Sequence, residues 1–167
     1  MQISYLGIGF QSLATTSNTQ KISSEQLLDS YAAGELDFPR VNLSNSIMTG
    51  VNLSLVNFRG AELNGSVLKR VNLARANLSM ADLSGANLTG ADLSGANLVW
   101  ADLHNANLAG ADLTGANLTG ADLTGANLNG TTMPDGTVLS SSKLSNRSSG
   151  KFNLISKFIS RLFTNHD

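Results

Sequence analysis

The sequence predicts an all-β protein in which the chain coils repeatedly about one axis. From Leu36 to Asp135 a five-residue phrase close to Ala-Asp/Asn-Leu-Ser/Thr-Gly occurs twenty times without an insertion. Every fifth residue from Phe38 to Met133 is Leu, Phe or Met, and most residues two places earlier are Ala or Val. A repeat this strict requires each phrase to take the same shape and to stack on its neighbours.

Each phrase reads as one short extended side followed by a corner. In an extended chain Ala91 and Leu93 point to one face and Asp92 to the other. Gly95 then ends the phrase with a turn signal. A helix does not fit, because a period of five spreads the leucines around its cylinder. A flat sheet does not fit either, because a turn arrives every five residues.

Four sides per coil, or 20 residues, is the closure that the polar pattern favours. Asp then stacks in columns on two opposite acidic faces, Asn fills the two faces between, and amide ladders can form there. The aspartates are Asp82, Asp102 and Asp122 on one face, and Asp92 and Asp112 on the other. A three-sided coil of 15 residues would alternate Asp and Asn along every column. The spacing alone leaves both closures open.

The run resembles the pentapeptide-repeat family, whose members fold as a right-handed, four-sided parallel β-helix. The resemblance covers residues 35–136 and implies about five coils. It also implies that the central Leu or Phe of each phrase points inward, with the small residue two places before it. Ile47 and Val67 depart from the family pattern, because they replace the usual outward Asn or Asp. The implied core ladder includes Phe38, Leu43, Met48, Leu53, Phe58, Leu63, Leu83, Leu103 and Leu123.

A short N-terminal capping helix is predicted at residues 23–34, after a flexible or loosely packed segment at 1–22. Ser23 and Gln26 have the spacing of a capping box, and Gly34 is a C-terminal stop. The helix carries an apolar stripe of Leu27, Leu28 and Tyr31. Because stacked coils expose unpaired edges, we expect this helix to cover the first coil.

The C-terminal end combines a Ser/Gly-rich linker at 137–150 with a helical tail at 151–167. Within the tail, residues 151–163 are predicted to form a basic amphipathic helix whose apolar stripe consists of Phe152, Ile155, Phe158, Ile159 and Leu162. This helix either caps the last coil or joins two rods as a homodimer. Contact with an anionic membrane is the third alternative, for which three cations are few.

Composition argues against several classes of function. The chain has no Cys and only two His, and no nucleophile stands out, so we expect no enzyme and no catalytic residue. His104 near Asp102 reads as a solvated surface pair. The aspartates do not converge on one point as a metal site requires, so we expect neither metal nor cofactor. A net charge of −1 argues against direct nucleic-acid binding. With no apolar stretch of membrane-spanning length and no basic leader, we expect a cytoplasmic protein.

Charge and side-chain type single out two surfaces. Residues 81–130 carry five Asp and no Lys or Arg, whereas residues 36–80 carry five Lys or Arg against two acidic residues. Val99-Trp100 replaces the usual Ser/Thr-Gly, and a 20-residue coil places Met80 beneath Trp100. The sequence therefore predicts a protein-interaction patch of Met80, Val99, Trp100 and His104.

These features together predict a non-enzymatic scaffold that binds an unidentified protein partner through its outer faces. Some members of the family are acidic rods that imitate duplex DNA and bind DNA gyrase or topoisomerase. The resemblance therefore implies an alternative, a DNA-mimicking inhibitor of a type II topoisomerase such as DNA gyrase. Five aspartates are sparse beside DNA, which carries one charge per ~1.7 Å of axis.

Overall fold

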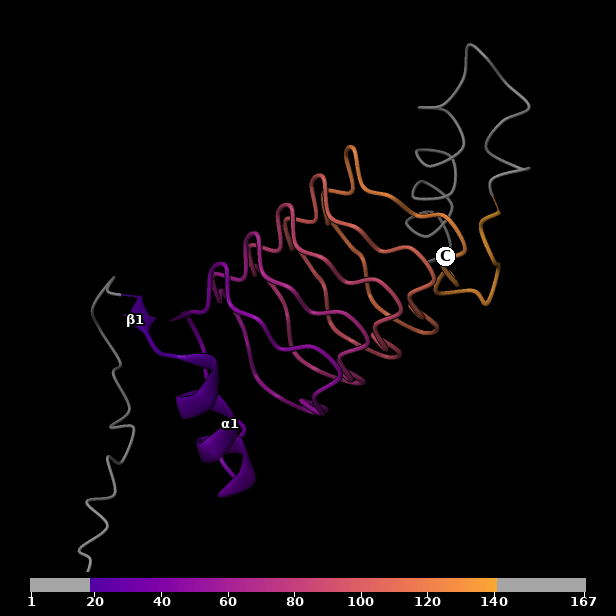
Figure 1. Cartoon of the computed structure of the whole chain (residues 1–167). Coiled ribbons are helices and arrows are strands. Elements are labelled where there is room, and N and C mark those ends of the chain that lie inside the picture. The colour runs from indigo at the N-terminus through magenta and orange to yellow at the C-terminus, as the bar shows by residue number, and fades with distance from the viewer. Residues whose placement is uncertain (1–18, 141–167) are drawn as a thin grey trace, which may run out of the picture.

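The computed structural model of the chain describes residues 19–140 and shows a rod of stacked coils with one helix at its N-terminal end (Figure 1). Parallel bridges join each side to the residue 20 positions further on, from Asp37 with Asn57 to Asp112 with Thr132. A 20-residue coil made of five-residue phrases has four sides. The chain is therefore a quadrilateral parallel β-helix, and the three-sided closure is excluded.

Backbone hydrogen bonds explain the position of glycine in the phrase. The amide of Leu83 donates to the carbonyl of Asp102 in the next coil at 2.7 Å, and that of Ala86 closes the corner on the Leu83 carbonyl at 3.0 Å. The residue at the third position of this turn, Gly85, has a φ of 63°. Glycine adopts such a φ without strain, whereas other residues pay for it.

A second corner bond explains the preference for Asp or Asn at the outward position. Asn87 Oδ1 accepts from the backbone N–H of Thr89 at 3.2 Å, and Asp92 Oδ1 accepts from that of Ser94 at 2.9 Å. Short polar side chains favour such turns because they bond to the backbone two residues on. The polar residue of the phrase is therefore first of all a corner brace.

Amide ladders form on the two sides that lie between the Asp columns. Asn97 Nδ2 donates to Asn77 Oδ1 at 3.3 Å, and Asn77 Nδ2 donates to Asn57 Oδ1 at 3.1 Å. On the other Asn side, Asn127 Nδ2 donates to Asn107 Oδ1 at 3.1 Å. These bonds run along the rod axis and tie successive coils together.

The interior is a continuous stack of apolar side chains. Ser66, which replaces a small apolar residue, is also buried, and its hydroxyl donates to the Leu63 carbonyl at 2.6 Å. Phe38 and Phe58 stack in one column with ring centroids 6.2 Å apart. Buried residues include the predicted core ladder of Phe38, Leu43, Met48, Leu53, Phe58, Leu63, Leu83, Leu103 and Leu123.

Helix α1, Ser24–Ala32, covers the N-terminal end of the rod (Figure 1). The Ser23 hydroxyl accepts from the Gln26 amide at 3.1 Å, and the Gln26 side chain accepts from the Ser23 amide at 2.9 Å. This is the reciprocal capping box that the spacing predicts. Leu27 is fully buried against the first coil. The helix ends in a Schellman motif, in which the Gly34 amide donates to the Tyr31 carbonyl.

Short segments at both ends differ from the prediction. The sequence predicts a loose segment up to residue 22, whereas β1, Gln20–Lys21, pairs in parallel with β2, Val41–Asn42. It predicts a linker from residue 137, whereas Val138 forms an antiparallel bridge with Thr132. In both cases the backbone groups at the end of the rod form hydrogen bonds with the flanking segment. Amino-acid composition alone does not predict such bonds. Residues 1–18 and 141–150 of these segments, and the predicted tail at 151–167, lie outside the described residues.

Candidate interaction surface

Trp100 is the most unusual residue at a corner of the coil. Its side chain is 67% exposed, and its φ is 58° at a position where the phrase normally has Gly. A Cβ built on Gly120, one coil further on, would lie 2.4 Å from Trp100 Cε3. The indole ring therefore lies against the bare backbone of Gly120. The glycine of one coil makes room for the aromatic side chain of the previous coil.

Met80 occupies the same corner column as Trp100, one coil earlier. Its side chain is 58% exposed, and its sulfur accepts a weak hydrogen bond from Arg59 Nη2 at 3.7 Å. Val99 is half-buried, and its amide donates to Asn97 Oδ1 at 3.2 Å. The structure thus places Met80, Val99 and Trp100 along one corner of the rod, and Arg59 adds a cation to that corner.

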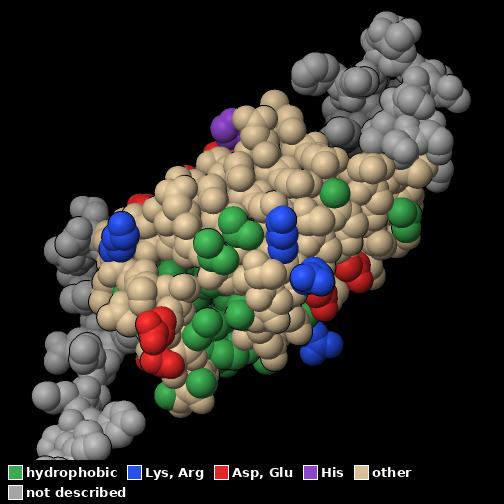
Figure 2. All heavy atoms as spheres, viewed as in Figure 1, with side chains coloured by type: hydrophobic (Ala, Val, Ile, Leu, Met, Phe, Trp, Pro, Cys, Tyr) green, Lys and Arg blue, Asp and Glu red, His purple; other side chains and the backbone are tan. Residues whose placement is uncertain are grey.

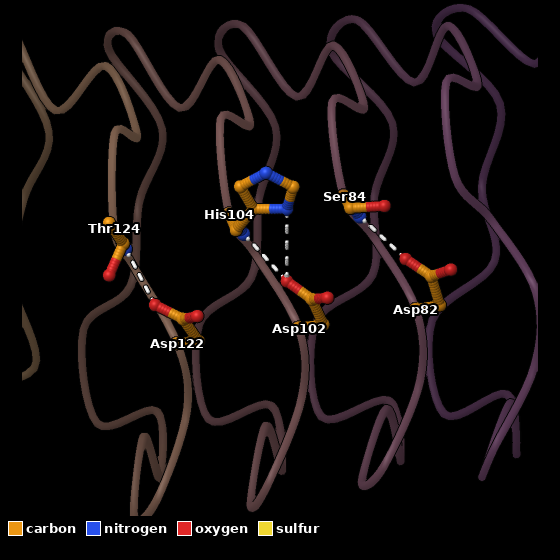
Figure 3. A network of polar contacts seen from close by, with 6 residues as sticks. All are labelled: Asp82, Ser84, Asp102, His104, Asp122 and Thr124. Carbon is orange, nitrogen blue, oxygen red and sulfur yellow. Dashed lines mark hydrogen bonds and ion pairs between the residues drawn. The ribbon is translucent and has the colours of Figure 1, made fainter.

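His104 stands on the next side of the coil, one residue before the following corner at Asn105. Its Nδ1 lies 3.7 Å from Asp102 Oδ1, and both side chains are 49% exposed (Figure 3). This separation is too long for a hydrogen bond, so the carboxylate does not orient the ring. The pair is a solvated contact between neighbours on one side, as the sequence predicts.

The aspartates of one face stand in a row, one in each coil (Figure 3). Asp82, Asp102 and Asp122 each use Oδ1 to accept from the backbone amide two residues on, at 2.8–2.9 Å. One oxygen of each carboxylate braces a corner, which leaves the other oxygen for solvent or a partner. Each carboxylate therefore stabilises a corner with Oδ1 and leaves Oδ2 available to a partner.

Two aspartates have pKa values below the ordinary value for the side chain. The hydroxyl and then the amide of Thr114 hold the pKa of Asp112 down, against a small opposing effect of burial. The hydroxyl and then the amide of Thr124 do the same for the pKa of Asp122. Hydrogen bonds to the ionised form favour that form, so the corner brace also keeps these carboxylates charged.

Large apolar side chains are also exposed at two places outside the predicted patch. Ile47 is 70% exposed and forms a bridge with Val67 in the next coil, so that the two replace rungs of an Asn column. Leu55, at a corner with a φ of 64°, is 58% exposed. The signal was present in the sequence, because apolar residues stand where the phrase has polar residues or Gly.

Arginines occupy other corner positions of the N-terminal half. Arg40, Arg70 and Arg75 have φ values of 53–57°, and the Cγ of each lies 3.3–3.4 Å from a Cβ built on the glycine one coil further on. Among residues 19–140 no Lys or Arg forms an ion pair with a carboxylate. Figure 2 shows one face on which hydrophobic and basic side chains adjoin, and acidic side chains lie on the same face.

Two other kinds of site are absent from the described residues. Between residues 19 and 140, no three His, Cys, Asp or Glu side chains gather closely enough to hold a metal ion. In the same part of the chain, no helix has the length and apolar character needed to cross a membrane.

Comparison with known protein families identifies the class. The family described as "Pentapeptide repeats (8 copies)" matches residues 37–73, 66–105 and 96–133, which together span more than half of the chain. The chain belongs to the pentapeptide-repeat family. The fold is accordingly a right-handed quadrilateral β-helix, and members of the family are typically non-enzymatic structural or interaction proteins. Among curated protein sequences, none matches this chain.

Solved structures of pentapeptide-repeat proteins resemble the chain. One is from the thylakoid lumen of Arabidopsis thaliana, with 34% identity over 59% of this chain and 66% of that chain, at a TM-score of 0.38. Another, from Nostoc PCC 7120, has 32% identity over 66% of this chain and 98% of that chain, also at 0.38. The plasmid-mediated fluoroquinolone resistance protein QnrB1 has 19% identity over 58% of this chain and 52% of that chain, at 0.36.

Proposed function

We propose that this protein is a non-enzymatic scaffold that binds a protein partner through the corner carrying Met80, Val99 and Trp100. One observation carries the proposal. A tryptophan that is 67% exposed adopts a left-handed φ at the corner position of the phrase, which is Gly in most phrases. Such a backbone conformation costs about 1–2 kcal/mol for a residue with a side chain. The side chain contributes nothing to the buried core in return, and this favours a role at the surface.

The chemistry of the corner suits protein recognition. Tryptophan is enriched among the residues that dominate binding energy at protein interfaces, and methionine adapts its shape to a partner. The indole ring rests on Gly120 and is therefore held in place before a partner arrives. A rigid anchor loses little side-chain entropy on binding. Arg59 beside Met80 gives the rim of the surface a positive charge.

Affinity capture with matched variants tests the proposal. Trp100→Ala removes the anchor, whereas Leu55→Ala removes another large exposed side chain from a corner with a left-handed φ. We expect a partner that is retained by the wild type and by Leu55→Ala and is lost with Trp100→Ala. Far-UV circular dichroism would verify that both variants keep the fold. Equal recovery with all three proteins would refute the assignment of the corner.

A second candidate function rests on the row of Asp82, Asp102 and Asp122. Each of these carboxylates keeps one oxygen outside the corner hydrogen bond, and stacked carboxylates can stand in for a row of phosphates. An inhibition assay of gyrase supercoiling would decide between the two functions. Inhibition that survives Trp100→Ala but disappears when the three aspartates become asparagines would support DNA mimicry. Asparagine retains the side-chain oxygen that accepts the corner hydrogen bond. We therefore expect the triple Asn variant to keep the fold of the wild type.

A further inference from the structure

At the C-terminal end of the rod, several backbone amides have no acceptor among residues 19–140. In interior coils two amides of each side donate to the next coil, as Leu103 does to the Asp122 carbonyl at 2.8 Å and Asn105 to the Thr124 carbonyl at 2.9 Å. No described residue accepts from the equivalent amides of the last coil, which belong to Leu118, Gly120, Leu123, Gly125 and Leu128. An open row of this kind is a template for pairing or must be covered.

The described chain covers only part of this end. The segment after the last coil folds back, so that the Gly130 amide donates to the Leu139 carbonyl and the Leu139 amide to the Thr131 carbonyl. The sides before that corner have no such cover from the part of the chain that the structure describes. Ala121 and Ala126 are only partly buried, whereas the alanines at their positions in the interior coils are fully buried. The end thus presents both apolar surface and unpaired donors.

The opposite end shows what an adequate cover contributes. Helix α1 buries Leu27 completely on the first coil. The Tyr31 hydroxyl donates to the Ser54 carbonyl at 3.0 Å, and the Ile22 amide donates to the Asn42 carbonyl at 3.4 Å. One short amphipathic helix and its flanks therefore supply both an apolar surface and polar partners to an end of the rod.

We propose that residues 151–163 of the same chain occupy the open C-terminal end. Leu139 leaves the coil packed against its core, next to the uncovered sides, and the sequence continues from there to Asp167. The ten residues 141–150 reach roughly 33 Å when extended at about 3.3 Å per residue, which is ample to return across one coil. The segment offers an apolar stripe for the end, namely Phe152, Ile155, Phe158, Ile159 and Leu162.

Charge and tethering favour this occupant over a free partner. The segment carries Lys151, Lys157 and Arg161, and the nearest described coils carry Asp112 and Asp122 without any Lys or Arg. A short tether also holds the segment at an effective concentration in the millimolar range. A second copy of the chain would have to reach a similar concentration to compete.

Hydrogen exchange of the full chain tests the proposal, with two variants that add the same charge to the segment. Phe158→Asp places a carboxylate in the apolar stripe, whereas Ser160→Asp places one outside it. We expect the wild type and Ser160→Asp to be monomeric by light scattering. Their amides at Leu118, Gly120, Leu123, Gly125 and Leu128 should exchange at least about tenfold more slowly than in Phe158→Asp. The interior amides of Leu103 and Asn105 should be equally protected in all three proteins, which shows that the coil is intact.

Three results would overturn the proposal. The first is exchange at the five end amides that is equally fast in the wild type and in Phe158→Asp. The second is protection that rises with protein concentration together with a dimeric mass, which would assign the end to a second copy. The third is protection that arises only when vesicles containing phosphatidylserine are added, which would assign the segment to a membrane. If Phe158→Asp loses the interior protection, Ile155→Ser serves as a milder variant in the same comparison.

Discussion

The two halves of the rod have the same architecture but treat their corners differently. In the C-terminal half, nearly every corner is Gly and every outward position up to Asn127 is Asp or Asn. In the N-terminal half, corners include Leu55, Arg70 and Arg75 with left-handed φ, and the apolar residues Ile47 and Val67 replace corner braces. The fold therefore tolerates local strain as long as the inward residues are kept.

The N-terminal half loses corner hydrogen bonds, and its core gains no compensating contact. The amides of Thr49 and Lys69 have no acceptor among the described residues, because Ile47 and Val67 have no side-chain oxygen to offer. Residues that break a local rule without a local gain are expected at functional surfaces. In the C-terminal half, Trp100 and Asn105 are the two corners up to Gly130 that are not Gly, and Trp100 is the apolar one.

The largest expected effect concerns the glycine beneath the indole ring. Gly120→Ala forces a Cβ to 2.4 Å from Trp100 Cε3, whereas Gly115→Ala meets nothing within 4 Å. Both substitutions carry the cost of a left-handed alanine, about 1–2 kcal/mol, and Gly120→Ala adds the clash. Urea unfolding should show a loss about 1–3 kcal/mol larger for Gly120→Ala. In a Trp100→Ala background the two losses should be equal, and a persistent difference would contradict the packing of the ring on Gly120.

An intermediate effect, a gain in stability, is expected when a missing corner acceptor is restored in the N-terminal half. Ile47→Asn supplies an acceptor for the Thr49 amide, and little burial is lost because Ile47 is 70% exposed. We expect the free energy of unfolding to rise by about 0.5–1.5 kcal/mol. Ile47→Ala removes the same side chain without adding an acceptor and serves as the control. If both variants have the same midpoint in thermal unfolding, the missing brace does not limit the stability of this half.

The smallest expected effect is a loss of stability in acid that arises from aspartates of the C-terminal half. The pKa values of Asp112 and Asp122 are lower in the folded chain than the ordinary 3.8. Their contribution is therefore fully present above that value and is lost as the pH falls through the folded pKa. Unfolding between about pH 5 and pH 2 should depend less on pH in the double variant Asp112→Asn and Asp122→Asn. An unchanged slope would show that these carboxylates do not feel the corner bonds.

Local rules were enough to predict the shape of each phrase, the identity of the core and the N-terminal cap. The two-residue spacing of Ala and Leu fixes which side chains turn inward, and Gly or a short polar residue fixes the corner. The capping box of Ser23 and Gln26 follows in the same way from neighbours in the chain. These features depend on contacts within a few residues, which the order of amino acids states directly.

The tertiary structure alone decided which coils face each other and how corner side chains lie. The 20-residue register depends on leucines from four sides meeting across the interior. Phrases of the same local shape could equally form a coil with a different number of sides. The direction of Trp100 depends on the empty space above Gly120, a residue 20 positions away. The sequence by itself determined every side and every corner of this protein. Only the packing of one coil on the next decided what its surface presents, because that packing joins residues that no local pattern connects.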